Sequence, residues 1–239
     1  MNCILHLSTK KKQEQILSNE RIETYLYNRQ IKKDCDFNMW FFFPGPESFA
    51  MSSLGYLWLY RALDLTEDID IERIYSDTKT TRLMRDRINV IGSSFTFDMD
   101  FLHILKFIEW NKYEFKAKDR KDSEPLIFAG GPVVTANPEP YKEIFDFFII
   151  GDGEEVNIEV VNTCKIMKDK QKSEILKELS KLEGVYVPSL RQSSVKKLTK
   201  KLTECIYTPI LSDKAFFPET FILEVERGCA NRCGFCLAS

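Results

Sequence analysis

The residues best suited to chemistry are three cysteines near the end of the sequence, Cys229, Cys233 and Cys236. They are separated by three and then two residues, so one short loop carries all three thiols. Thiolates bind zinc and iron–sulfur clusters, and a tetrahedral metal site normally takes four protein ligands. With three ligands, one iron of a cluster is open to an outside ligand, which permits chemistry beyond electron storage. The spacing therefore predicts a reactive metal centre on this loop.

A structural zinc site is the alternative, because Cys205 lies near enough in sequence to supply a fourth thiolate. The spacing disfavours it, since structural zinc sites usually pair short Cys-x2-Cys segments. Cys3, Cys35 and Cys164 are scattered, and the total of seven is odd. This pattern is not that of a disulfide scaffold, so we expect a reducing, cytoplasmic setting.

Composition excludes several classes of protein. The 239 residues include 44% apolar residues and 18 Phe, enough for a buried core. The net charge of −2 gives no broad basic field, so general nucleic-acid binding is not expected. No segment has ~20 consecutive uncharged apolar residues, and the apolar opening is too short for a signal peptide. We therefore expect a folded protein without a membrane span.

The elements that must position the cysteines begin with five short apolar runs. Each run is nearly continuous in β-branched or aromatic residues, as in strands buried on both faces of a parallel sheet. Helical patterns lie between them, with weaker ones at 78–87 and 140–144. The order predicts an α/β domain with a doubly wound five-stranded parallel sheet over residues 37–168. The runs are residues 39–43, 69–75, 88–93, 126–129 and 145–150, and the helical patterns are 53–63, 97–113 and 154–167.

Other segments flank this domain. Residues 1–36 are predicted to be an N-terminal helical extension, with an amphipathic helix over 10–33. Residues 169–218 are predicted to hold a charged helix, a hairpin of 185–188 with 195–202, and a linker over 208–218. Residues 221–226 are predicted to be a strand leading into the cysteine loop, so that 219–239 begins a second domain.

Ligands of doubly wound sheets bind beyond the carboxyl ends of the strands. Three loops are expected there: residues 44–48, 92–96 and 130–132. Their glycines and small hydroxyls permit close approach of a planar or anionic ligand, although such turns are also ordinary connectors.

The cysteine spacing, with Phe235 before the third cysteine and the lead-in of residues 224–228, resembles the radical S-adenosylmethionine (SAM) superfamily. The resemblance implies that the three cysteines bind a [4Fe–4S] cluster. It also implies that SAM chelates the open iron and is cleaved to a 5′-deoxyadenosyl radical. A one-electron donor such as a flavodoxin or ferredoxin is implied as partner. Phe235 would pack beside the cluster or the adenine, and Arg227 would offset cluster charge unless it is a surface ion-pair residue.

Residues 130–132, 138–140 and 146–154 are similar to the cobalamin-binding-like domain, of flavodoxin-like fold, that often precedes radical SAM cores. The Asp-x-His-x-x-Gly run that supplies a cobalt ligand in such domains is missing. The two histidines are His6 and His103, and His103 is expected to be an ordinary helix residue. Cobalamin binding is therefore not expected.

A radical SAM core is a partial barrel, and this chain carries only its first strand and cysteine loop. We therefore expect the N-terminal portion of a longer radical SAM enzyme of unknown substrate, unable to turn over by itself. A shortened gene product would have the same sequence. The alternatives are a non-catalytic remnant or scaffold domain, and the structural zinc module.

Overall fold

The main domain is built on one six-stranded sheet. The structure, a computed structural model, describes residues 15–18, 21–29, 32, 35–77, 88–201, 205–231 and 233–236. The strand order is β4-β3-β5-β6-β7-β8, with every pair parallel except β7 and β8. Taken along the chain, the five parallel strands have the flavodoxin-like order 2-1-3-4-5, so the predicted doubly wound α/β fold is confirmed. The strands are β3 (Asn38–Phe43), β4 (Asp70–Tyr75), β5 (Val90–Ser94), β6 (Leu126–Gly130), β7 (Phe147–Ile149) and β8 (Val185–Tyr186).

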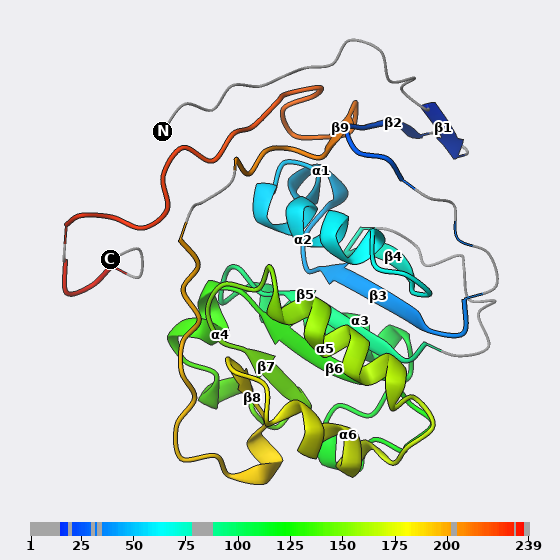
Figure 1. Ribbon diagram of the computed structural model, residues 1–239, viewed down its shortest axis with the longest axis vertical. Coiled ribbons are helices and arrows are strands. Elements are labelled where there is room, and N and C mark those ends of the chain that lie inside the picture. Colours follow the sequence, from blue (N-terminus) through cyan, green and yellow to red (C-terminus); the bar gives the residue numbers. More distant parts are fainter. Residues whose placement is uncertain are drawn as a thin grey trace.

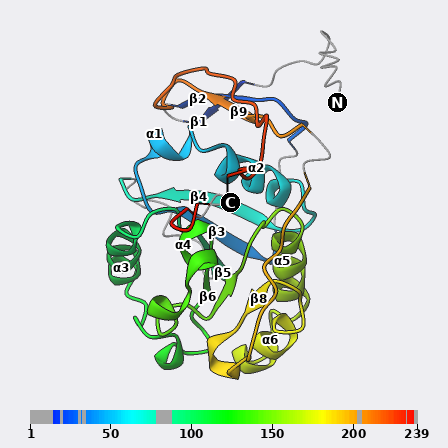
Figure 2. The same ribbon diagram turned by 90° about the vertical axis from the view of Figure 1, so that its left-hand side faces the viewer.

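Helices cover both faces of this sheet (Figures 1 and 2). One face carries α2 (Leu54–Asp64), α5 (Val156–Ile166) and α6 (Lys172–Leu179), and the other carries α3 (Asp100–Trp110) and α4 (Pro132–Ala136). Successive residues of a strand point to opposite faces. Met39 and Phe41 accordingly pack in the first core, and Trp40 and Phe42 pack in the second. Because both faces of β3 are buried, this strand is apolar from Met39 to Phe43.

The helices predicted over 53–63, 97–113 and 154–167 correspond to α2, α3 and α5, with shorter bounds for the last two. The turn predicted over 140–144 is a 3₁₀ turn at Glu139–Tyr141, and further 3₁₀ turns are Ala117–Asp119 and Pro188–Leu190. A short helix α1 (Glu47–Ala50) follows β3. The weak helical pattern over 78–87 lies outside the described residues.

The N-terminal segment is a hairpin, so the predicted amphipathic helix is wrong for the described residues. Strands β1 (Gln15–Ser18) and β2 (Arg21–Tyr25) pair antiparallel, and β2 also pairs with β9 (Ile210–Ser212). Glu23 and Tyr25 are buried, whereas Thr24 between them is half-buried, as expected of a strand. The partner β9 lies within the predicted linker over 208–218, which is therefore partly a strand.

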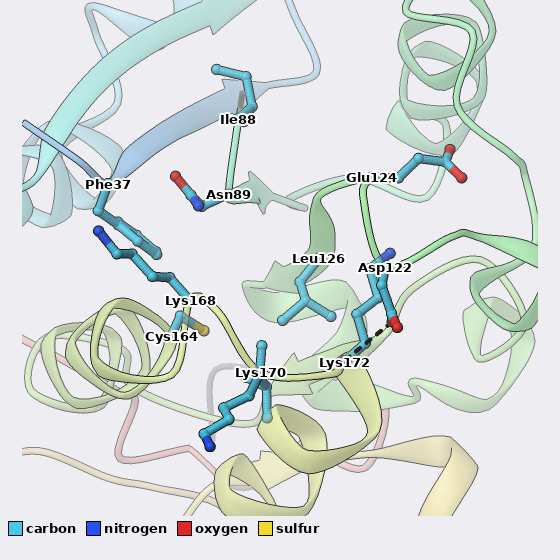
Figure 3. A pocket seen from close by; sticks show the side chains of 11 residues that line it. Phe37, Ile88, Asn89, Asp122, Glu124, Leu126, Cys164, Lys168, Lys170 and Lys172 are labelled. Carbon is cyan, nitrogen blue, oxygen red and sulfur yellow. Dashed lines mark hydrogen bonds between the residues drawn. The ribbon is translucent and has the colours of Figure 1, made fainter. Parts of the chain in front are cut away.

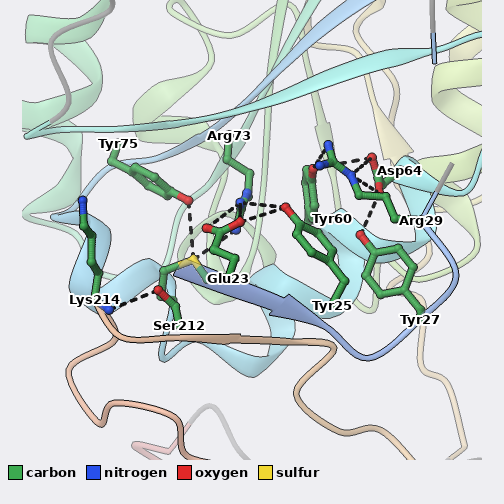
Figure 4. A network of polar contacts seen from close by, with 11 residues as sticks. Glu23, Tyr25, Tyr27, Arg29, Tyr60, Asp64, Arg73, Tyr75, Ser212 and Lys214 are labelled. Atoms are coloured by element: carbon green, nitrogen blue, oxygen red, sulfur yellow. Dashed lines mark hydrogen bonds and ion pairs between the residues drawn. The ribbon is translucent and has the colours of Figure 1, made fainter. Parts of the chain in front are cut away.

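A buried polar network fixes this small sheet to the main domain (Figure 4). The guanidinium of Arg73 on β4 lies 2.7 Å from the Glu23 carboxylate, and both side chains are buried. Arg29 lies 3.1 Å from Asp64 at the end of α2, and the Tyr27 hydroxyl donates to the same carboxylate at 2.7 Å. A buried charge needs a partner to offset its lost hydration, so these pairs specify how the two sheets pack.

One predicted pairing is wrong, and one predicted strand is reduced to a single bridge among the described residues. Strand β8 pairs with β7 instead of forming a hairpin with 195–202, and Leu198 forms a bridge with Gly151. The predicted strand over 221–226 makes only one bridge, between Tyr207 and Leu223. The partner of β8 lies almost 40 positions away in sequence, where local patterns give no signal.

Candidate functional site

A cavity of about 530 Å³ lies at the carboxyl ends of the parallel strands. This is the edge where ligands bind in doubly wound sheets. It is lined by Phe41, Gly55, Trp58, Leu59, Ser93, Ser94, Phe128, Gly130, Gly131, Pro132, Thr135, Ala136, Ile149, Gly151, Asp152, Gly153, Glu154, Asn157, Lys197, Arg227 and Cys236. The pocket in Figure 3 lies at the opposite ends of the strands and has a volume of only about 20 Å³. That volume suits about one water molecule, so the larger cavity is the candidate site.

Two of the three predicted loop ranges contribute to this cavity: 92–96 through Ser93 and Ser94 at the end of β5, and 130–132. Residues 44–48 do not line it. Gly131 has φ of 119°, and a Cβ there would lie 2.6 Å from the carbonyl oxygen of Phe95. The site therefore requires glycine at this position. Ser93 is 3% exposed, and its hydroxyl has no hydrogen-bond partner among the described residues. A buried polar atom without a partner is uncommon, and it offers one hydrogen bond to a ligand.

The loop after β7 forms another wall of the cavity. Gly151 has φ of 99°, and its amide donates to the Thr135 hydroxyl at 2.9 Å. The Asp152 amide donates to the Leu198 carbonyl at 3.0 Å, and its carboxylate accepts from the Lys200 amide at 2.6 Å. These contacts join the loop to the segment that follows β8.

Arg227 belongs to an ion-pair group with Glu224, Glu154 and Asp152. Its guanidinium donates twice to Glu224, each time at 2.8 Å, and lies 2.7 Å from Glu154 and 3.5 Å from Asp152. Hydrogen bonds to Glu224 and Glu154 raise the pKa of Arg227, so it is a cation at neutral pH. Sequence reasoning offered two roles for Arg227, cluster partner or ion-pair residue, and the structure places it in an ion-pair group.

The three cysteines of the motif are exposed. Figure 1 shows their segment beyond the carboxyl ends of the strands, and Cys236 lines the cavity. The Cys236 amide donates to the Cys233 carbonyl at 3.0 Å. Within the described part of the chain, no three His, Cys, Asp or Glu side chains lie close enough to hold a metal ion. The thiols therefore share one loop but are not gathered around a common point.

Three other residues for which the sequence suggested a role are Phe235, Cys205 and His103. Phe235 is 92% exposed, and its predicted place beside a cofactor stays a prediction. Cys205 is disulfide-bonded, so it is not available as a fourth thiolate. His103 lies on α3, where its Nδ1 is 2.8 Å from the Pro44 carbonyl oxygen, which is the ordinary helix role expected of it. No helix of the described residues is long and apolar enough to cross a membrane.

Comparisons with known proteins add a family. Residues 81–188 match the family described as radical SAM proteins, N-terminal. An uncharacterised protein of Methanocaldococcus jannaschii, MJ0966, is 34% identical over 164 residues, which is 64% of this chain and 31% of that protein. The chain thus spans about a third of the length of this relative.

A solved structure is also similar, that of the cobalamin-dependent SAM radical enzyme OxsB with aqua-cobalamin and SAM bound. It matches with a TM-score of 0.44 and 14% identity, over 76% of this chain and 29% of that one. The expectation that cobalamin is not bound stays a prediction. Residues 81–188 are thus similar to the N-terminal region of radical SAM proteins, and the strand order shows that the domain has a flavodoxin-like fold.

Proposed function

We propose that this chain is the N-terminal portion of a radical SAM enzyme, in which Cys229, Cys233 and Cys236 bind a [4Fe–4S] cluster. The observation that carries the proposal is three exposed thiols on one loop in a chain whose preceding domain is similar to the N-terminal region of radical SAM proteins. When bound, such a cluster with SAM supplies a 5′-deoxyadenosyl radical.

The donor set suits this cluster. Thiolates are its usual ligands, and the exposed loop lets the three side chains rotate towards a common centre. Three protein ligands leave one iron for SAM. A one-electron donor such as a flavodoxin or ferredoxin is part of this proposal, because the cluster must be reduced before SAM is cleaved.

The residues of the α/β domain have supporting roles. Cys236 lines the cavity at the strand ends, so a cluster on this loop would lie beside whatever the cavity holds. Apolar side chains such as Phe128 and Ile149 exclude water from one side of that space. The cavity is therefore the proposed binding site for a second cofactor or a substrate, and aqua-cobalamin is the first compound to test.

The zinc alternative is less well supported. It needs a fourth thiolate, and Cys205 is disulfide-bonded. Metal analysis separates the two proposals, because zinc sites contain no acid-labile sulfide.

The test is anaerobic reconstitution of the full chain with iron and sulfide. We expect Cys229→Ser, Cys233→Ser and Cys236→Ser each to lose the cluster, because two thiolates do not hold it stably. Cys35→Ser is the matched control and should keep its iron, since Cys35 lies outside the motif. Unchanged iron and sulfide in all three motif variants would overturn the proposal.

A further inference from the structure

Arg227 connects the cysteine loop to the α/β domain. It precedes the first motif cysteine by two residues, and its partners Glu154 and Asp152 lie in the loop after β7, more than 70 positions earlier. Arg227 and Glu154 both line the cavity, as does Cys236. The contact thus joins the segment that carries the thiols to a wall of the cavity.

The three carboxylates around Arg227 have different consequences. Glu224 is three residues away on the same segment, so its two hydrogen bonds shape that segment without joining it to anything else. Glu154 lies across the gap at 2.7 Å, and Asp152 lies at 3.5 Å. The side chains of Arg227 and Glu154 are 24% and 13% exposed. Water screens this pair less than a fully exposed one, so it holds the two segments together more strongly.

Hydrogen bonds on both sides of Glu154 fix the backbone of its loop. The Leu198 amide donates to the Ile150 carbonyl at 3.0 Å, immediately before the loop. The Gly153 carbonyl accepts from the Asn157 side-chain amide of α5 at 2.7 Å. Glu154 therefore keeps a fixed place relative to β7 and α5, and an arginine paired with it takes its position from the sheet.

We propose that Arg227 is a positioning residue whose ion pair with Glu154 holds the cysteine loop at the mouth of the cavity. The ion pair thereby keeps the three thiols next to the cavity. It sets the distance between a ligand in the cavity and a metal centre on the cysteines. The proposal rests on the proposed function only in taking the centre on the cysteines to be a [4Fe–4S] cluster. The ion pair between Arg227 and Glu154 itself needs no cluster.

The test is limited trypsin digestion of the full chain without metal, following cleavage after Arg227 by mass spectrometry. Trypsin must take the Arg227 side chain into its own pocket, so cleavage needs the ion pair to open. Glu154→Gln should speed this cleavage roughly five- to thirtyfold, because cleavage follows the population of the open form. The neighbouring substitution Glu155→Gln is the matched control, since Glu155 pairs with Lys200 and is 80% exposed. Its rate should stay within about twofold of the unsubstituted chain.

Two further results separate positioning from general stability. The urea midpoint of Glu154→Gln should equal that of the unsubstituted chain, and Glu154→Asp should recover most of the protection. Equal cleavage of the Glu154→Gln and Glu155→Gln chains would overturn the proposal. The proposal would also be overturned if Glu154→Gln lowered the urea midpoint enough to account for its faster cleavage. Because no cluster is present, failure here is distinct from failure of the cysteines to bind iron.

Discussion

Gly151→Ala should strongly destabilise the wall of the cavity. Gly151 has φ of 99°, a region that residues with a side chain rarely adopt, and forcing one there costs about 1–3 kcal/mol. An added Cβ would also lie 2.1 Å from the Leu198 carbonyl oxygen and 2.6 Å from its amide nitrogen. Both are backbone atoms, so the segment at Leu198 must move away.

That movement breaks two backbone hydrogen bonds of Leu198, one to Ile150 and one from Asp152. Each contributes about 0.5–1.5 kcal/mol, so the total cost is about 2–6 kcal/mol. Gly55 is the matched control, because it lines the same cavity but its Cβ would meet nothing within 4 Å. Gly55 lies in α2, where alanine is a better helix former, so Gly55→Ala should raise stability by up to about 1 kcal/mol.

The assay is urea unfolding of the full chain at 25 °C, followed by circular dichroism. The reasoning predicts a lower midpoint for Gly151→Ala and an equal or higher one for Gly55→Ala. If both variants unfold within about 0.5 kcal/mol of the unsubstituted chain, the close contact of Gly151 with Leu198 is refuted.

Two other predictions concern buried ionisable groups. Arg120→Met should cost about 3–5 kcal/mol in urea unfolding, because it leaves the buried Asp146 carboxylate without its cation at 2.7 Å. Lys116→Ala removes an exposed pair with Glu143 and should leave the urea midpoint nearly unchanged, so equal shifts in the two variants would contradict this prediction. Burial raises the pKa of Tyr25 from its ordinary value of 10 to about 12, so its contribution to stability is complete below pH 10 and is lost as the pH rises towards 12. Tyr25→Phe should therefore lessen the fall of the unfolding free energy between pH 10 and 12, and an identical fall in both chains would refute this.

The central strands were predictable because burial on two faces leaves a signal within each strand. Residues such as Met39, Trp40 and Phe41 are all apolar, whichever face they occupy. The carboxyl edge of such a sheet is a general binding site, so two of the cavity loops were predictable as well.

The N-terminal hairpin was missed because its strands depend on distant partners. Residues 22, 25 and 26 fit a helical spacing, but Glu23 and Tyr25 also alternate with Thr24 in the way a strand requires. What decides between them is pairing with β9, which is almost 190 residues away, and the buried contact with Arg73. The pairing of Arg227 with Glu154 was missed for the same reason, since nothing near Arg227 in sequence points to Glu154.

The most direct test of the central claim is the electron paramagnetic resonance spectrum of the anaerobically reconstituted and reduced chain, recorded with and without SAM. The account predicts about four iron and four sulfide per chain. It also predicts the signal of a reduced [4Fe–4S] cluster, whose shape changes when SAM binds the open iron. Zinc without sulfide, or a cluster signal that SAM leaves unchanged, would contradict it.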